Sequence, residues 1–292
     1  MRIGFSLLNN WGIADAQALV DLAPRAEDLG LDSVWVHDHV FNVAHVLERI
    51  GDRPYYEPLT FLTYVAARTR RVRLGTSVLV LPYHNPIRLA KAAATLDVLS
   101  GGRLVMGIGV GAVENEMEAM GTPFKERGAF TDEAIAAMRA LWTQAEPRFD
   151  GRYSRFAGMP FSPKPAQQPS IPIVIGGVSA AAIRRAARLG DGWQPLGLSP
   201  DAVAEGIATL RREAQACGRD PAAIPVSIAM SLTESRPRRW ALGTKPDEVV
   251  RNAKAYAAAG VETLIVSANT SDPRAAHAAL EMIAREVLPA VR

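Results

Sequence analysis

Short, largely apolar stretches alternate with longer amphipathic ones along the whole chain. The short stretches lack the strict alternation of half-exposed strands, and continuous apolar character is typical of strands buried on both faces of a parallel sheet. Eight such stretches are predicted to be strands: RIGFSLL (2–8), DSVWVH (32–37), VRLGTSVLVL (72–81), RLVMGIGV (103–110), IPIVIGG (171–177), GWQPLGL (192–198), PVSIAMSL (225–232) and ETLIVSA (262–268).

The amphipathic stretches begin and end at residues that favour helix termini. Pro86 opens PIRLAKAAATLDVLS at a first-turn position, where its missing N–H costs nothing. Ser179 begins SAAAIRRAARLG, which ends on a glycine. A helix is also predicted over 15–29, although Pro24 lies inside it and is expected to kink or split it. At least one helix therefore follows each predicted strand.

Eight strands, each followed by a helix, predict an α/β fold of the (β/α)₈ or TIM-barrel type. A doubly wound open sheet is the alternative, but no G-x-G-x-x-G follows the first strand, which weighs against a dinucleotide-binding version. We expect one domain over residues 1–292. The long stretch between the fourth and fifth strands carries an Asp150-Gly151 turn and a proline-rich segment. Residues 146–172 are therefore expected to form a lid over the barrel mouth that selects the substrate.

Composition narrows the class of protein. The 292 residues are 48% hydrophobic and 22% charged, with a net charge of +3. No apolar run approaches the ~18 residues of a membrane-spanning helix, and the N-terminus lacks the features of a signal peptide. We therefore expect a cytoplasmic protein without a membrane partner. The basic runs RTRRVR (68–73) and RPRR (236–239) come without any nucleic-acid-binding motif, so they are interpreted as solvated surfaces. The single cysteine, Cys217, is expected to have a packing role.

Candidate chemistry gathers at the carboxyl ends of the predicted strands, where barrel enzymes carry their active sites. The second strand ends in His37-Asp38-His39, and the fifth in Gly176-Gly177-Val178-Ser179. The second of these motifs places two glycines before a helix N-terminus, which is a pattern that binds phosphate but equally one that makes a tight turn. The fourth strand ends in GIGVG, in which Gly109 and Gly111 either let a flat ligand approach the backbone or relieve crowding at the barrel rim.

A metal site at the second strand is the main alternative reading of the two histidines. His37 and His39 share one face of a strand, as in metal-dependent barrel hydrolases of the amidohydrolase type. The other strand ends carry glycine, tryptophan, serine, alanine and asparagine rather than further ligands. His45, His84 and His277 lie in loops or in the last helix. Too few ligands converge, so no metal ion is expected.

Four segments together carry a resemblance to the bacterial luciferase-like family of flavin- and deazaflavin-dependent oxidoreductases, most closely its branch that uses the 5-deazaflavin coenzyme F420. The segments are GLDSVWVHDHV (30–40), RVRLGTSVLVLPYHNPIRLAKAAATLDVLSGGRLVMGIGVG (71–111), FKERGAFTDEAIAAMRALW (124–142) and IPIVIGGVSAAAIRRAARLGDGW (171–193). They follow the order of the family and cover most of residues 1–200. The last hundred residues fit the barrel but carry little signature.

The resemblance implies a barrel that holds the cofactor ring at its carboxyl-terminal mouth. It implies that Asp38 and His39 line the ring pocket, and that a non-prolyl cis peptide at Ser77–Val78 supports the far face of the ring. It also implies that the turn 176–179 holds the phosphate of the coenzyme. One position departs from the family. Its F420-dependent sugar-phosphate dehydrogenases have an acid directly after the strand-four glycines (G-T-G-E), where this chain has Ala112.

Two later acids, Glu114 and Glu116, are expected only to cap or orient the next helix. The predicted activity is hydride transfer between F420 and a small organic substrate. His39 is the candidate proton donor or acceptor, and Asp38 is expected either to set its tautomer or to contact the cofactor, while His37 is expected to be structural. FMN in a two-component monooxygenase is the alternative. A non-catalytic flavin-binding relative or a metal-dependent hydrolase is more remote. A homodimer is expected from the family.

Overall fold

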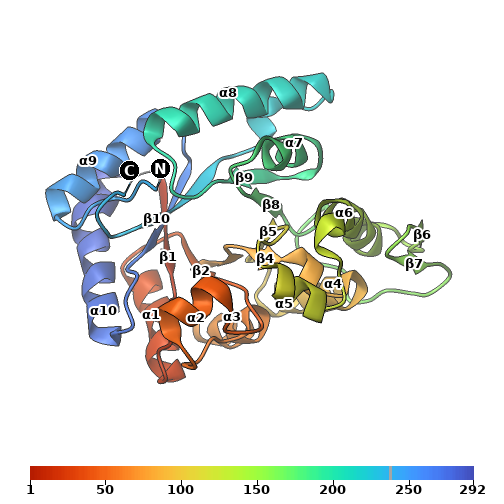
Figure 1. The fold of residues 1–292 in the computed structure, drawn as a ribbon, viewed down its shortest axis with the longest axis horizontal. Helices are drawn as coiled ribbons and strands as arrows, with labels where there is room; N and C mark the ends of the chain where they lie inside the picture. The colour runs from red at the N-terminus through yellow and green to blue at the C-terminus, as the bar shows by residue number, and fades with distance from the viewer. Residues whose placement is uncertain (237–238) are drawn as a thin grey trace.

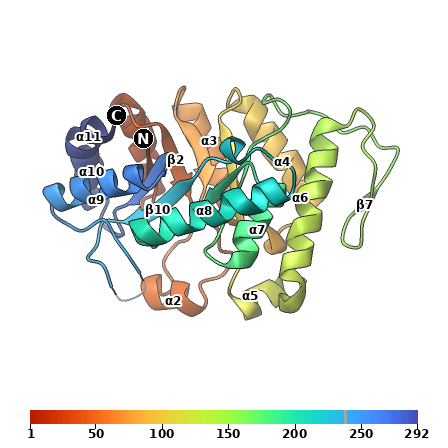
Figure 2. The same cartoon turned by 90° about the horizontal axis from the view of Figure 1, so that it is seen from above.

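The computed structural model describes residues 1–236 and 239–292, and its central feature is a ring of parallel strands enclosed by helices (Figures 1 and 2). The strands follow the order β10-β11-β1-β2-β3-β5-β8-β9, and single bridges from Trp193 to Val226 and from Leu196 to Ala229 join the two end strands. The eight predicted strands therefore form the predicted (β/α)₈ barrel. Their bounds are β1 Arg2–Ser6, β2 Ser33–Val36, β3 Arg73–Thr76, β5 Leu104–Gly109, β8 Ile173–Gly176, β9 Gly192–Gln194, β10 Ser227–Ser231 and β11 Thr263–Ser267.

The third predicted strand is interrupted near its end. β3 pairs with β5 as far as Gly75, and a short second piece, β4 (Leu79–Val80), resumes the pairing with β5 at Ile108. The peptide bond Ser77–Val78 between the two pieces is cis, as the family resemblance implies. The interruption turns residues 77 and 78 out of the strand at the carboxyl end of the barrel, where both line the cavity described below.

Helices surround the barrel, and most begin at a proline or a side-chain cap. The larger ones are α1 Ala16–Asp28, α3 Pro58–Arg68, α4 Pro86–Leu99, α6 Arg127–Thr143, α7 Ala180–Leu189, α8 Pro200–Ala216, α9 Pro246–Ala258 and α10 Pro273–Met282. The shorter ones are α2 Ala44–Ile50, α5 Glu114–Ala119, a π-helical turn at Ile283–Val287, α11 Leu288–Val291 and 3₁₀ turns at Leu81–Tyr83, Phe124–Glu126 and Pro221–Ala223. The expected split at Pro24 is wrong, because α1 continues through it with the nearby residues Ala23 and Ala26 fully buried in the core, and the expected kink stays a prediction.

Side chains fill the barrel at the amino ends of its strands, and the barrel is open at the carboxyl ends. Trp35, Val105, Val174 and Ile265 form a buried cluster inside the ring. Gly75 faces the Trp35 ring, so a methyl group at that position would overlap the indole. The interior is thus packed at the amino ends of the strands, which leaves the carboxyl ends free to build a site.

The connection between β5 and β8 packs on the outside of the barrel. It contains a two-stranded hairpin, β6 (Phe149–Asp150) and β7 (Arg155–Phe156), in which residues 151–154 form the turn. The Glu133 carboxylate of α6 accepts hydrogen bonds from the N–H groups of residues 152, 153 and 154. In Figure 2 the hairpin projects beside α6. None of residues 146–172 lines the cavity described below, and the expected role of this segment as a lid stays a prediction.

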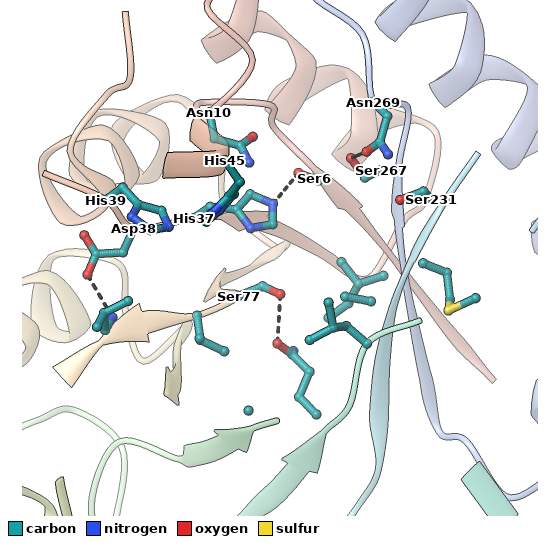
Figure 3. A pocket seen from close by; sticks show the side chains of 18 of the residues that line it. Ser6, Asn10, His37, Asp38, His39, His45, Ser77, Ser231, Ser267 and Asn269 are labelled. Carbon is teal, nitrogen blue, oxygen red and sulfur yellow. Dashed lines mark hydrogen bonds between the residues drawn. The ribbon is translucent and has the colours of Figure 1, made fainter. Parts of the chain in front are cut away.

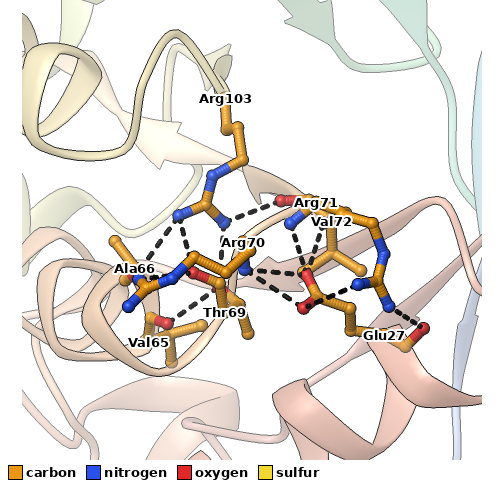
Figure 4. Close-up of polar contacts among 8 residues, drawn as sticks. All are labelled: Glu27, Val65, Ala66, Thr69, Arg70, Arg71, Val72 and Arg103. Carbon is orange, nitrogen blue, oxygen red and sulfur yellow. Dashed lines mark hydrogen bonds and ion pairs between the residues drawn. The ribbon is translucent and has the colours of Figure 1, made fainter.

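The middle of the basic run 68–73 is held against α1 by the carboxylate of Glu27. Glu27 of α1 accepts the backbone N–H groups of Arg70, Arg71 and Val72, and Arg103 donates to backbone carbonyls from Ala66 to Val72 beside it (Figure 4). The second basic run falls partly on residues 237–238, outside the described residues.

Two other expectations from the sequence can be compared with the structure. Cys217 is exposed at the end of α8, so the expected packing role is wrong. Among the described helices, none combines the length and the apolar character needed to cross a membrane.

Candidate active site

A cavity of about 380 Å³ opens at the carboxyl ends of the strands (Figure 3). Its size falls in the range of small-molecule sites, roughly 300–1,000 Å³. Residues from all eight barrel strands or from the segments that follow them line it, and after β5 the lining residue is Ala112. The side chains used below are those of Asn10, Trp11, His37, Asp38, His39, His45, Arg49, Tyr55, Ser77, Val78, Gly176, Gly177, Gln194 and Arg239.

His39 is held by a carboxylate that lies behind the cavity wall. Its Nδ1 lies 2.6 Å from Oε2 of Glu116, whose side chain is fully buried. The same oxygen accepts the Tyr83 hydroxyl at 2.8 Å. The other oxygen, Oε1, accepts the backbone N–H groups of Val40 and Phe41 at 2.7 and 3.0 Å. Each carboxylate oxygen therefore has two donors, and the loop after β2 is fastened to α5.

The charge state of Glu116 determines the proton position on His39. Burial by itself would raise the pKa of Glu116, but the hydrogen bonds from His39, Phe41 and Tyr83 outweigh it and bring the pKa to about 2. An ionised carboxylate can only accept, so Nδ1 of His39 must carry a hydrogen. In the neutral imidazole, Nε2 is then left with a free lone pair. The expectation that Glu116 merely caps or orients α5 is wrong, because its carboxylate reaches across to the loop after β2.

The Asp38 carboxylate is hydrogen-bonded to a different histidine, His84. Its Oδ2 accepts His84 Nε2 at 2.7 Å and the N–H of Val80 at 2.9 Å, and its side chain is 2% exposed. Burial lowers the pKa of His84, but the hydrogen bond and the charge of Asp38 outweigh burial and raise it overall. Asp38 therefore does not set the tautomer of His39; Glu116 does. Within the described part of the chain, Oδ1 of Asp38 accepts no hydrogen bond.

His37 lies deeper in the barrel and is neutral. Its Nε2 lies 3.0 Å from the Ser6 hydroxyl, and its backbone N–H donates to the amide oxygen of Asn9 (Figure 3 shows the serine contact). Burial lowers the pKa of His37 to about 4. These contacts agree with the expected structural role, although the ring also forms part of the cavity wall.

The cis peptide and three glycines form one packed unit on the opposite wall. The Ser77 hydroxyl donates to Gln194 at 2.8 Å, and the Val78 side chain lies between Gly109 and Gly176. A β-carbon at either glycine would approach Val78 to within 2.8 or 2.6 Å. Gly111 has a φ of +77° and gives similar room to Val80. Gly109 and Gly111 do not line the cavity, so their visible role is to make room for the wall residues.

The glycine turn after β8 lies partly in the cavity and partly at its rim. Gly176 and Gly177 line the cavity, and Gly177 has a φ of +121°, which favours glycine. Val178 is exposed, and the Ser179 side chain caps α7 by accepting the N–H of Ala182. The structure thus brings the first two residues of this motif to the cavity and places the other two at the helix N-terminus that borders it.

The sequence did not reveal the roles at this site of Glu116, His84, Arg49 and Tyr55. The sequence signal that could point to a further carboxylate at the barrel mouth is Ala112, which stands where the family has an acid. Among the described residues, no three His, Cys, Asp or Glu side chains come together in a way that could hold a metal ion.

Comparisons with known proteins agree with this architecture. Residues 1–242 match the family described as luciferase-like monooxygenase. The chain is 31% identical to an F420-dependent glucose-6-phosphate dehydrogenase of Nocardia farcinica, over 94% of each chain. A structure of the monooxygenase RslO1 from Streptomyces bottropensis shares 25% identity with a TM-score of 0.82, over 99% of each chain. An F420-dependent secondary alcohol dehydrogenase in complex with an F420-acetone adduct has a TM-score of 0.84 at 21% identity, covering 100% of this chain and 99% of its own, and shows the shared fold.

Proposed function

Because this chain belongs to the luciferase-like monooxygenase family, we propose that it is an oxidoreductase that transfers a hydride between coenzyme F420 and a small organic substrate. The observation that carries the proposal is the His39–Glu116 pair at the wall of the cavity. A buried ionised carboxylate and a partly exposed imidazole form a proton-transfer pair of the kind that accompanies hydride transfer at a carbon–oxygen bond.

The cavity fits a flat ring with a phosphate-bearing tail. Gly176 and Gly177 let a ligand approach the backbone closely, and the N-terminus of α7 beside them favours an anion. Asp38 can accept an N–H group of the ring through Oδ1. The residues that would hold the coenzyme are Asp38, His39, Ser77, Val78, Gly176, Gly177, Val178 and Ser179. When bound, F420 supplies the hydride chemistry.

The chain's own contribution is to position the substrate and to move one proton. With Nδ1–H bonded to Glu116, Nε2 of His39 can take the proton of a substrate hydroxyl during oxidation. The resulting imidazolium is stabilised by the carboxylate at 2.6 Å, and in the reverse direction it returns the proton to the oxygen of a carbonyl. His37 has a pKa of about 4 and stays neutral at pH 7, so it does not compete for this proton.

A turnover assay tests this function. Purified protein supplied with F420 or with its reduced form is offered alcohols, aldehydes and ketones, and the visible absorbance of the coenzyme is followed. We expect coenzyme reduction or oxidation that depends on both the protein and the substrate, and that is lost in the variant His39→Asn. Turnover that requires reduced FMN and dioxygen instead would contradict the proposal.

An FMN-dependent monooxygenase is the second candidate, favoured by the likeness to the monooxygenase RslO1. The turn 176–179 suits the phosphate of either cofactor, so FMN is the natural competitor in each assay. A homodimer and a cytoplasmic location remain predictions from the sequence.

A further inference from the structure

A second, smaller cavity lies at the opposite end of the barrel, at the amino ends of the strands. It measures about 220 Å³, which is below the roughly 300–1,000 Å³ of sites for drug-sized ligands, so it has room for a fragment-sized molecule. Among the described residues, none lines both this cavity and the one that His39 lines. The apolar layer of Trp35, Val105, Val174 and Ile265 separates the two cavities.

Hydroxyl and cationic side chains replace the usual apolar ones on the inner face of the strands at this end. Residues two positions apart on a strand share a face, so Ser33 faces inward like Trp35, and Arg73 faces inward like Gly75, whose β-carbon would meet that tryptophan. The same spacing places three further lining residues on the inner face, Arg2, Ser227 and Thr263. Bulky branched side chains dominate the interior layers of such barrels. The short hydroxyl side chains leave that volume unfilled.

The charge of Arg73 is poorly offset within the protein. Among the described residues, its guanidinium donates one hydrogen bond, from Nη2 to the amide oxygen of Gln167 at 3.3 Å, and forms no ion pair with a carboxylate. The nearby Asp97 carboxylate is already bonded to the backbone and side-chain N–H groups of Gln167. Burial lowers the pKa of Arg73 and the charge of Arg2 lowers it further, while Asp97 raises it. This half-buried cation therefore lacks an anionic partner.

The second cation, Arg2, is only loosely held. Its Nη2 lies 3.5 Å from Oε2 of Glu262, and with both side chains about half exposed (48% and 54%) such an ion pair is weak. Asp32 is the one carboxylate among the described lining residues, and its Oδ2 accepts the N–H of Ile3 at 2.9 Å. It pairs with neither arginine in the described part of the chain. The lining therefore carries two cations and one anion over an apolar floor.

We propose that this cavity is a second ligand site, separate from the active site, that binds a small aromatic carboxylate. The carboxylate lies between Arg2 and Arg73, because a planar guanidinium can donate two parallel hydrogen bonds to it. The ring packs on the apolar floor beside Trp35. Such a ligand supplies the missing counter-ion of Arg73 and relieves the repulsion between the two arginines. The site does not depend on the proposed function, and its ligand stabilises the folded chain without taking the place of the coenzyme.

Calorimetric titration of the full chain with three probes tests the site. Benzoate carries the ring and the charge, benzamide keeps the ring without the charge, and acetate keeps the charge without the ring. Two variants change the site in different ways: Arg73→Gln removes the half-buried cation, and Thr263→Leu fills the cavity while both arginines stay in place. Arg71→Gln is the matched control, because Arg71 belongs to the same basic run, its side chain is 71% exposed and it does not line the cavity.

We expect one benzoate per chain on the wild type and on Arg71→Gln, with affinities within about 3-fold of each other. Benzoate should bind Arg73→Gln and Thr263→Leu at least roughly 10-fold more weakly, as for loss of a charge-assisted contact or of the space itself. Benzamide and acetate should bind the wild type at least roughly 10-fold more weakly than benzoate does. Saturating F420 should leave the benzoate affinity unchanged, because the coenzyme would occupy the other end of the barrel.

The absence of saturable benzoate binding to the wild type overturns the proposal, and so does a smaller loss than this in Arg73→Gln or in folded Thr263→Leu. Benzamide or acetate binding as tightly as benzoate overturns it as well, because the arginines or the apolar floor would then make no contact with the ligand. Benzoate binding that F420 abolishes places the anion in the active-site cavity and also overturns it. If Thr263→Leu does not fold, Arg73→Gln decides, since the loss of a cation without a counter-ion removes little from the folded state.

Discussion

Replacing Glu116 by glutamine should invert the proton position on His39. The oxygen Oε1 accepts two backbone N–H groups, from Val40 and Phe41, so the amide oxygen of a glutamine must stay there. The amide nitrogen then takes the place of Oε2 and faces His39 Nδ1, which is 2.6 Å from that atom. Because an amide nitrogen donates, Nδ1 must become the acceptor and Nε2 must carry the hydrogen. The ring is then unable to accept a proton from the substrate.

The structure sets the size of both effects. A pKa of about 2 for Glu116, against an ordinary value of 4.5, corresponds to about 3 kcal/mol of preference for the ionised form. The two backbone hydrogen bonds that the glutamine oxygen keeps reduce this to about 2 kcal/mol of lost stability in the variant. This contribution is fully present above pH 4.5 and is lost as the pH falls toward 2. Loss of the base should lower kcat by at least about 100-fold.

Nitrogen NMR of ¹⁵N-labelled histidine reads the tautomer directly and needs no substrate. In the wild type the neutral His39 ring should carry its hydrogen on Nδ1, and in Glu116→Gln on Nε2. Tyr83→Phe is the matched control, because it removes another donor to the same oxygen at 2.8 Å without changing which groups can donate to His39. It should keep the wild-type tautomer and most of kcat. An unchanged tautomer in Glu116→Gln, or equal losses of kcat in the two variants, would refute the reasoning.

Three further predictions concern His37 and Gly176 at the cavity wall and Glu27 next to the amino end of β3. The pKa of His37 is about 4 in the folded protein and near 6.5 in the unfolded chain, so the free energy of unfolding should fall by about 3 kcal/mol as the pH drops from 6.5 to 4. Urea unfolding of His37→Asn should lack this part of the pH dependence. A pH profile identical to that of the wild type would count against the burial of the ring. Gly176→Ala should weaken F420 binding at least about 10-fold in a fluorescence titration, because a β-carbon there meets Val78 at 2.6 Å and pushes it into the cavity. Wild-type affinity in this variant would show that this wall does not contact the coenzyme. Glu27→Gln should lower the free energy of unfolding by about 2 kcal/mol in chemical denaturation, because three backbone donors lose a charged acceptor. The control Glu205→Gln, at an exposed position, should leave the free energy of unfolding almost unchanged.

Local patterns predicted the parts of the molecule that depend on local order. The apolar strands and their spacing gave the barrel, and the motifs at the strand ends led to Asp38, His39 and Gly176. The partners of those residues could not be read in the same way. The contact between His39 and Glu116 joins positions far apart in sequence, and it depends on how the loop after β2 packs on α5. The periodic pattern of apolar residues in a sequence does not predict such packing between distant segments.

Two other features were hidden for related reasons. Arg49 looks like one more surface charge on a short helix until the fold brings it beside Trp11 at the cavity mouth. Pro24 is a helix breaker by propensity, yet the buried face of α1 keeps the helix continuous. In both cases tertiary packing overrides or creates the role of a residue.

The central claim is that this cavity binds F420 in preference to FMN, and parallel titrations of the purified protein with the two cofactors test it most directly. Coenzyme fluorescence should show saturable binding of one F420 per chain, with FMN binding much more weakly or not at all. Binding of FMN alone would contradict the deazaflavin assignment, and binding of neither cofactor would contradict the oxidoreductase itself.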